Sequence, residues 1–501
     1  MTRRRCRRLA YPLLVVLGLG TAAALTARAP QAAQDPARAA AVDMVFARWD
    51  SVTTPGCAVG VSVAGRTVLE RAYGMAELEQ GIANTPATIF ENGSVSKQFT
   101  AAAVVMLALE GRLSLDDDVR RWVPEIPDYG HTIRLRHLLN HTSGLRDWGS
   151  VAGISGWGRS QRTHTHAHVL DILSRQSALN FEPGHEYSYS NSGYNLLAII
   201  VERASGIPFA RFSAERIFGP LGMTHTQWRD DYRRIVPGRS AAYQWRPEGG
   251  FIIDRPIENV HGNGGLLTTV GDLLVWTRAL QEGRFGGPDF ARLLQERGRL
   301  NDGTIIPYAA GLVVDSTLGV PSVAHSGSTS GYRAHLGRFP EQDLAVAVLC
   351  NVGAANASRY WREVAAIYLD GEGAPGPEGA PGPATGVGAG AEGEVDRSPP
   401  APGALTAYAG VYHSVDAETT LRVVVEGDRL VMLRRPDDRF PLEPVRADAF
   451  TGGLGEVRFL RDGAGRVVEL SLQQSRVYDL RFQRVAENAA HAPRPPSGWA
   501  P

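Results

Sequence analysis

The sequence predicts a large mixed α+β domain followed by a small antiparallel β domain. Strand-like runs at residues 55–73 and 309–350 enclose a stretch richer in helical patterns, which indicates one sheet built from both ends of the domain. Residues 371–402 repeat Gly-Ala-Pro-Gly-Pro and have almost no bulky apolar side chain, which is typical of a linker. Beyond them, short alternating runs separated by turn residues predict a barrel or a sandwich.

The N-terminal residues predict a secretory signal. Arginines crowd positions 3–8, an apolar run covers 9–25, and small residues follow. We therefore expect residues 1–29 to be a signal peptide, although cleavage after Ala27, Ala29 or Ala33 fits the pattern. An uncleaved anchor is the alternative, because the apolar run approaches the minimum length that spans a bilayer. The expected location is secreted or periplasmic, or membrane-anchored if the signal is retained.

The charge balance excludes one class of partner. The chain of 501 residues carries 52 basic and 52 acidic side chains. Residues 1–29 hold six arginines and no acid, so the remainder has 46 basic and 52 acidic residues, a formal charge of −6. A nucleic-acid-binding protein needs a basic surface, and we predict no nucleic-acid partner.

The elements of the large domain follow in order. A hairpin is expected over 55–73 with its turn at 64–66, and a helix over 94–111 with its apolar face on Val95, Phe99, Ala102, Met106 and Leu107. Helices are also predicted at 195–204 and 270–282, strands at 309–315, 333–339 and 344–350, and a final helix reaching 368. The predicted domains are 38–370 and 403–487, separated by the linker at 371–402 and followed by a loose tail at 488–501.

The small domain shows five short alternating runs. They cover residues 421–426, 429–433, 457–460, 467–472 and 478–482, and turn residues separate them. Two cysteines outside the signal, Cys57 and Cys350, each lie in a strand-like run of the large domain. A disulfide between them and a pair of free buried thiols are equally consistent with the sequence.

Lys97 is the sole lysine of the chain, since the other 51 basic side chains are arginines. An ammonium can exchange a proton at an accessible pKa, whereas a guanidinium cannot. Lys97 follows Ser94 by three residues, which places the two side chains on one face of a helix. The alternative is a surface lysine left by biased codon usage.

Two further motifs follow Ser94-x-x-Lys97 in order, Tyr189-Ser-Asn191 and His325-Ser-Gly327. No serine lies at the centre of Gly-x-Ser-x-Gly, the motif of α/β-hydrolases. The nearest segment, Gly327 to Gly331, has a threonine at its centre. Each of the three motifs is weak alone. Their ordered combination is much more specific.

With these motifs the chain resembles the serine β-lactamase and penicillin-binding superfamily, in particular its class C β-lactamase, D-alanyl-D-alanine carboxypeptidase and esterase branch. The resemblance covers about residues 40–370. It implies a β-lactamase-like domain with an antiparallel sheet flanked by helices and a helical subdomain, and the C-terminal module resembles a lipocalin-like barrel. Further matching stretches begin at His137, Phe181, Tyr189, Pro220 and Gly264.

The resemblance implies that Ser94 is a nucleophile that forms an acyl-enzyme, with Lys97 and Tyr189 sharing the role of base. A phenol titrates near pH 10, so Tyr189 acts as a base only if a cation such as Lys97 lowers its pKa. The resemblance also implies that Tyr189 activates the water that hydrolyses the acyl-enzyme. The residue that takes the first proton stays open.

The remaining motif residues are expected to bind substrate. Asn191 would donate to a substrate carbonyl and hold Lys97, and His325 would be a cation at lower pH only, since an imidazole titrates near neutrality. Gly327 would let the substrate approach the strand. The N–H of Ser328 would form an oxyanion hole with that of Ser94.

These expectations describe an exported serine hydrolase without cofactor, acting on D-amino-acid peptides or small esters. The partner is then a small-molecule or peptide substrate, including one from the cell wall. A β-lactamase and a non-catalytic penicillin-binding-like recognition protein are the alternatives, and the oligomeric state stays open.

Alternating histidines at 164, 166 and 168 raise the possibility of a metal site. Thr163 followed by apolar residues at 169, 170 and 172 predicts a capped helix instead. On a helix the three side chains diverge, so we predict no metal.

Overall fold

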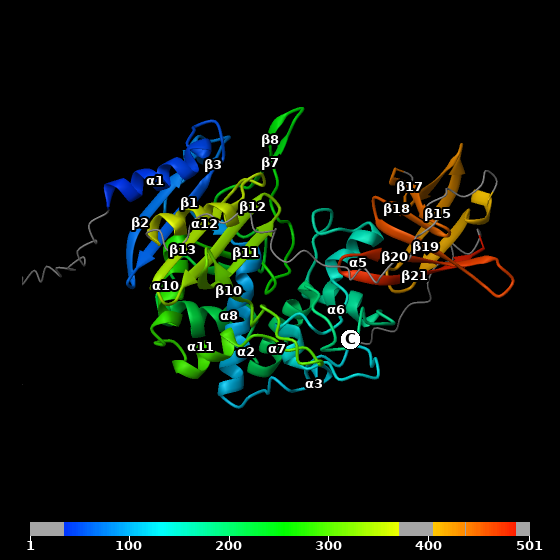
Figure 1. Cartoon of the computed structure of the whole chain (residues 1–501), viewed down its shortest axis with the longest axis horizontal. Coiled ribbons are helices and arrows are strands. Elements are labelled where there is room, and N and C mark those ends of the chain that lie inside the picture. Colours follow the sequence, from blue (N-terminus) through cyan, green and yellow to red (C-terminus); the bar gives the residue numbers. More distant parts are fainter. Residues whose placement is uncertain (1–34, 370–403, 436, 487–501) are drawn as a thin grey trace, which may run out of the picture.

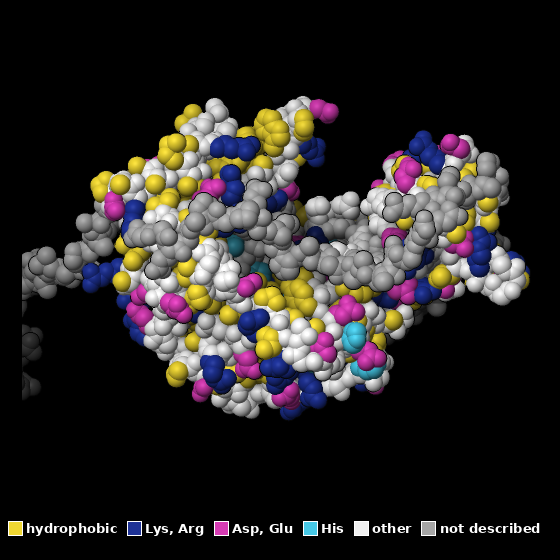
Figure 2. Space-filling view, in the orientation of Figure 1, with side chains coloured by type: hydrophobic (Ala, Val, Ile, Leu, Met, Phe, Trp, Pro, Cys, Tyr) yellow, Lys and Arg dark blue, Asp and Glu magenta, His cyan; other side chains and the backbone are white. Residues whose placement is uncertain are grey.

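The computed structural model describes residues 35–369, 404–435 and 437–486. The predicted signal peptide, linker and tail lie outside these ranges. Figure 1 shows a large domain and, on one side of it, a barrel formed by the C-terminal strands, and Figure 2 shows the same two parts in a space-filling view.

A six-stranded antiparallel sheet lies at the centre of the large domain, in the order β10-β11-β12-β13-β1-β2. Strand β1 pairs with β13, which joins the two ends of the domain and confirms the predicted discontinuous sheet. All seven residues of β13 are buried, as expected for a continuous apolar run in the interior of a sheet. The strands are β1 Cys57–Val63, β2 Arg66–Tyr73, β10 Val313–Thr317, β11 Val320–Thr329, β12 Tyr332–Phe339 and β13 Leu344–Cys350.

Helices cover both faces of this sheet. On one face, α1 (Pro36–Phe46) and α12 (Ala357–Tyr368) pack together over β12 and β13, and on the other α10 (Val270–Gln281) packs against β1 and β13. Figure 1 shows α1 on one side of the sheet and α10 and α11 on the other. The sheet is therefore the middle layer of three.

The helical subdomain is built around α2 (Lys97–Leu109) and α7 (Asn191–Ser205). The predicted apolar face of α2 packs into the core, and burial extends beyond it, because the residues from Lys97 to Val105 are all buried. Neighbouring helices enclose α2 on every side, and a periodic pattern does not reveal such enclosure. The other helices are α3 Val119–Trp122, α4 Leu135–Leu139, α5 Trp148–Ser155, α6 His166–Ser174, α8 Phe209–Ser213, α9 Gly219–Leu221 and α11 Gly287–Gln295.

Short strands connect the two parts. Strand β9 lies between β5 and β6 in a three-stranded sheet, while β3 pairs with β4 and β7 with β8. These strands are β3 Met75–Glu77, β4 Ile82–Ala83, β5 Phe90–Glu91, β6 Gln227–Trp228, β7 Tyr243–Arg246, β8 Gly250–Ile253 and β9 Leu266–Thr268.

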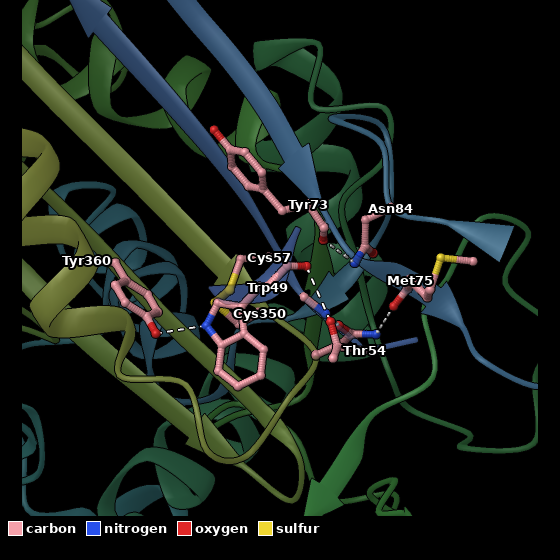
Figure 3. Close-up of a disulfide and its surroundings, with 10 residues drawn as sticks. Trp49, Thr54, Cys57, Tyr73, Met75, Asn84, Cys350 and Tyr360 are labelled. Atoms are coloured by element: carbon pink, nitrogen blue, oxygen red, sulfur yellow. Dashed lines mark hydrogen bonds between the residues drawn. A yellow bond between two sulfur atoms is a disulfide. The ribbon is translucent and has the colours of Figure 1, made fainter. Parts of the chain in front are cut away.

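A disulfide joins Cys57 to Cys350 and resolves the alternative left by the sequence. The two residues face each other in the register of β1 and β13. Figure 3 shows the disulfide beside Trp49, whose indole N–H donates to the Tyr360 hydroxyl at 2.8 Å. The cross-link thus lies where α1 and α12 cover the sheet.

The C-terminal domain is a closed antiparallel barrel of eight strands, which confirms the predicted barrel. Three of its strands, β14, β17 and β18, were not predicted. Strand β17 contains Pro441 and Pro444, which interrupt the pattern of a strand. The strands are β14 Gly410–Ser414, β15 Thr419–Glu426, β16 Arg429–Leu433, β17 Arg439–Arg446, β18 Ala449–Gly452, β19 Gly455–Arg461, β20 Val467–Gln474 and β21 Val477–Val485.

Within the described residues, no helix combines the length and the apolar character needed to cross a bilayer.

Candidate active site

Ser94 lies in a 3-10 turn, Gly93–Ser96, that leads directly into α2. Gly93 has a φ of 53°, a left-handed conformation that favours glycine. A Cβ on Gly93 would lie 2.6 Å from the backbone nitrogen of Ser328, so the turn packs tightly against β11. This packing fixes the position of Ser94 relative to the sheet.

Lys97 is the first residue of α2, and its side chain is completely buried. Its Nζ lies 2.9 Å from Asn191 Oδ1, 2.7 Å from the carbonyl oxygen of Asn263 and 3.1 Å from Ser94 Oγ. Burial holds the pKa of Lys97 well below its ordinary value, and the nearby charges of Arg476 and Arg159 lower it further. The sole lysine is therefore a buried residue and not a surface residue, and its surroundings favour the neutral amine more than water does.

Asn191 and Tyr189 flank the start of α7. The Asn191 backbone N–H donates to Asp147 Oδ2 at 2.7 Å, which fixes the asparagine while its side chain accepts from Lys97. The ring of Tyr189 lies 4.8 Å from Lys97 Nζ. Burial raises the pKa of Tyr189 to about 12, and the opposing effects of Ser94 and Arg476 are smaller. The pKa of Tyr189 is therefore raised and not lowered, whereas a role as base would require a neighbouring cation to lower it.

His325 lies in β11 and is buried. Its Nδ1 lies 2.6 Å from the Ser326 carbonyl oxygen and must donate to it, so Nε2 accepts the bond from the Tyr308 hydroxyl at 2.9 Å. Burial, with a smaller effect from Lys97, lowers the pKa of His325 to about 4. The expectation that this imidazole titrates near neutrality is wrong, and His325 is a neutral hydrogen-bonding group at pH 7.

Gly327 also lies in β11, next to the turn that carries Ser94. A Cβ at this position would lie 2.0 Å from the Asn92 carbonyl oxygen and 3.1 Å from the Ser94 backbone nitrogen. The absence of a side chain at Gly327 therefore lets the Ser94 turn approach the strand. The sequence-based prediction assigns this close approach to the substrate. The same approach brings the Ser94 turn beside the N–H of Ser328.

A cavity of about 650 Å³ opens over these groups. Every predicted site residue lines it except Lys97, which is buried behind Ser94. The cavity is also lined by Arg159, Tyr308, Arg333 and Arg476. The predicted residues thus come from the turn before α2, from the first residue of α2, from the start of α7 and the loop before it, and from β11, and they meet in one place.

Several residues of the site were missed by sequence reasoning. Asn263 contributes its backbone carbonyl, Asp147 acts through Asn191, and the ring of His141 packs 4.2 Å from that of Tyr189. Arg476 reaches the cavity from the barrel. Of these residues, only His141 lies in a stretch that resembles the superfamily, the one that begins at His137. The others carry no sequence signal of their own.

The three alternating histidines turn to separate partners. His166 begins α6, His168 Nδ1 accepts from the Thr165 N–H, and His164 Nε2 lies 2.7 Å from the Trp157 carbonyl oxygen. The cap of this helix is Thr165, so the prediction of Thr163 is wrong. In the described part of the chain, no group of three or more His, Cys, Asp or Glu side chains could hold a metal ion.

A half-buried serine and a buried lysine at the start of a helix, beside strand β11 of an antiparallel sheet, define a serine hydrolase of the β-lactamase fold. The family model described as Beta-lactamase matches residues 41–368. The chain therefore belongs to the β-lactamase family.

Individual relatives agree with this family. A penicillin-binding protein of Bacillus subtilis (strain 168) is 31% identical over 57% of this chain and 66% of its own length. A D-aminopeptidase of Gluconobacter oxydans (strain 621H) is 30% identical over 62% of this chain and 58% of its own length. The chain thus covers less than two thirds of these relatives.

Among solved structures, the octameric penicillin-binding protein homologue from Pyrococcus abyssi is similar with a TM-score of 0.59. It is 22% identical and covers 89% of this chain and 99% of its own. At this identity the likeness concerns the fold alone.

Proposed function

We propose that the protein is an exported serine hydrolase that forms an acyl-enzyme at Ser94 and acts on D-amino-acid peptides or small esters. The geometry of Lys97 carries this proposal. Asn191 Oδ1 and the Asn263 carbonyl oxygen can only accept hydrogen bonds, so they take two N–H groups of a neutral amine. Lys97 Nζ lies as a donor 3.1 Å from Ser94 Oγ, and a neutral amine would instead present its lone pair to this hydroxyl.

In the proposed acylation, the Ser94 hydroxyl attacks the substrate carbonyl and its proton passes to the neutral Lys97 amine. The backbone N–H groups of Ser94 and Ser328 receive the developing oxyanion. Collapse of the tetrahedral intermediate expels an amine or alcohol, which takes the proton back. Water then hydrolyses the acyl-enzyme, and Tyr189 is the group that would orient this water.

Lys97 is favoured over Tyr189 as the acceptor of the first proton. The pKa of the amine is lowered, which favours its basic form, whereas the pKa of the phenol is raised to about 12, which favours its acidic form. Burial causes both shifts, because it disfavours the charged form of either group. A neutral Tyr189 is then a proton donor near pH 7.

The substrate class is supported by two features. Relatives named as a D-aminopeptidase and a penicillin-binding protein favour D-amino-acid peptides, among them fragments of cell walls. The neutral His325 favours a peptidase or esterase, because a permanent cation in this third motif is absent.

Export is supported by the arginine-rich and apolar N-terminal sequence and by the disulfide between Cys57 and Cys350. Disulfides form and persist in oxidising compartments outside the cytoplasm. The proposed location is secreted or periplasmic.

The test is labelling of Ser94 by a fluorophosphonate and by a fluorescent penicillin, in the wild type and in Ser94→Ala. We expect the wild type alone to be labelled. Hydrolysis of nitrocefin, a p-nitrophenyl ester and D-alanyl peptides then separates the substrate classes. Fastest turnover of nitrocefin would favour a β-lactamase, and absence of label with both probes would favour a recognition protein.

A further inference from the structure

The C-terminal barrel places one of its arginines in the candidate active site. Arg476 lies in the turn between β20 and β21, at the end of the barrel that faces the large domain in Figure 1. Its backbone carbonyl accepts bonds from the Asp147 N–H at 3.2 Å and from Asn180 Nδ2 at 3.1 Å. Asn180 Oδ1 accepts in turn from the Tyr478 N–H at 3.0 Å. The turn is therefore held by its backbone, independently of the Arg476 side chain.

The side chain of Arg476 points into the cavity. Its guanidinium carbon lies 4.9 Å from the centre of the Tyr189 ring, and the residue lines the same cavity as Ser94. A planar cation on a tyrosine face is held in orientation without using up its N–H donors. These donors remain available to a ligand in the cavity.

The cavity is cationic. The described residues that line it include Arg159, Arg333 and Arg476 and no aspartate or glutamate. Two of these arginines already have partners: Arg159 makes a two-pronged ion pair with the buried Glu258, and Arg333 donates to the carbonyl oxygens of Ser330 and Tyr332.

Arg476 differs from them. Among the described residues, its guanidinium has no carboxylate within ion-pair distance and donates no hydrogen bond. The positive charge of Arg476 also disfavours a second cation nearby, since it lowers the pKa of Lys97. A positively charged substrate end would meet the same repulsion, and a carboxylate would relieve it.

We infer, on the basis of the proposed hydrolysis at Ser94, that Arg476 binds a carboxylate of the substrate. The substrate is then a peptide or related acyl compound with an unblocked carboxylate near the scissile bond. A neutral amide, or a peptide that is recognised through its free amine, would not use Arg476 in this way. The barrel thereby supplies a specificity-determining residue. A fork of N–H donors binds both oxygens of a carboxylate, which gives orientation as well as attraction.

The test compares two substrates that differ only in charge, an N-acetylated D-alanyl peptide with a free C-terminus and its C-terminal amide. For Arg476→Gln we expect kcat/KM toward the carboxylate substrate to fall about 10- to 100-fold, mainly through KM. The amide should change little. Arg476→Lys should lie between, because it keeps the charge and loses the fork. Arg429→Gln, an exposed barrel arginine, is the matched control and should match the wild type.

An equal loss on both substrates would assign Arg476 to positioning the barrel turn and would overturn the inference. No loss on either substrate, or a wild type that prefers the amide, would overturn it as well. Fluorophosphonate labelling of Ser94 in the same samples separates this result from the proposed function. Labelled Ser94 without charge discrimination rejects the role of Arg476 alone, whereas unlabelled wild-type Ser94 rejects the hydrolase.

Discussion

At the scale of single residues, Lys97 is the group on which the proposed chemistry depends. Its amine is buried among two obligate acceptors and one hydroxyl. We predict that Lys97→Arg lowers kcat/KM by about 10²- to 10⁴-fold, because a guanidinium stays protonated and cannot accept the Ser94 proton. Rates of fluorophosphonate labelling and of ester hydrolysis measure the loss.

Because arginine is larger than the lysine it replaces, Lys97→Met serves as a second variant that fits the buried site. Circular dichroism and thermal unfolding show whether each variant folds. A folded variant of either kind with near wild-type turnover would mean that Lys97 is not the base.

The pKa directions predict how activity depends on pH. The amine is active when deprotonated, so the rate should rise as pH increases through the lowered pKa of Lys97 and reach its plateau well below pH 10.5. Tyr189, with a pKa of about 12, stays neutral over this range. A pH profile of kcat/KM for a neutral ester, from pH 5 to 10, tests this. A rate that still climbs at pH 10 would contradict the lowered pKa.

The buried histidines predict a separate dependence of stability on pH. His325, with a folded pKa of about 4, and His141, whose pKa burial also lowers, both bind protons more weakly in the folded state than in the unfolded state. Stability is then fully present above about pH 6.5 and falls as pH drops towards 4. For His325 alone the loss is on the order of 3 kcal/mol.

Chemical denaturation at pH 7.5 and pH 4 measures this loss. His325→Asn should make the dependence weaker, since it removes one titrating group. A stability that is the same at both pH values would show that these imidazoles are not kept neutral by burial.

At the scale of elements, the contact between β11 and the turn before α2 controls the geometry of Ser94. We predict that Gly327→Ala abolishes labelling of Ser94, because the new Cβ would lie 2.0 Å from the Asn92 carbonyl oxygen and force the two elements apart. Gly249→Ala is the control, since a Cβ there has no neighbour within 4 Å. Labelling of Gly327→Ala at the wild-type rate would show that the turn has room to move.

The disulfide acts on the sheet rather than on the site. It links β1 to β13 across 293 residues of sequence. We expect Cys57→Ala/Cys350→Ala to lower the free energy of unfolding by about 2–5 kcal/mol, because the cross-link restricts the unfolded chain. Activity at room temperature should be retained. Urea unfolding of the double variant, followed with and without reductant, provides the measurement, and reductant should affect the wild type only.

The elements also show which features a sequence can predict. The sheet and the barrel follow from patterns that are local in the chain, whereas the meeting of Ser94, Tyr189 and His325 follows from the resemblance that their ordered motifs carry. The enclosure of α2, the carbonyl of Asn263 and the reach of Arg476 depend on long-range packing, to which no local pattern corresponds. The pKa of His325 lies well below the expected value, and Tyr189 does not meet the condition for a base, because burial, which a motif does not report, exceeds the effect of neighbouring charges.

At the scale of the whole molecule, the barrel docks through charged groups that the interface buries. Arg146 of the large domain donates to Asp416 of the barrel at 2.7 Å, and their side chains are only 2% and 11% exposed. Ser177 also donates to Asp416 from its backbone and its hydroxyl. Asp147, which follows Arg146 in the chain, donates its backbone N–H to the Arg476 carbonyl oxygen and accepts the Asn191 N–H through its side chain. Docking is thus connected to the partner of Lys97 by successive hydrogen bonds.

This connection predicts that Asp416→Ala affects both stability and catalysis. Removing one partner of a buried ion pair leaves the other charge uncompensated, which costs about 3–5 kcal/mol. We expect the barrel to unfold or detach at a lower urea concentration than the large domain, so that one cooperative transition becomes two. The kcat/KM for carboxylate substrates should fall before the large domain unfolds, because Arg476 leaves the cavity with the barrel. Arg146→Met/Asp416→Ala should regain part of the stability, since no unpaired charge remains. A single transition at the wild-type midpoint in Asp416→Ala would mean that this ion pair does not hold the two domains together.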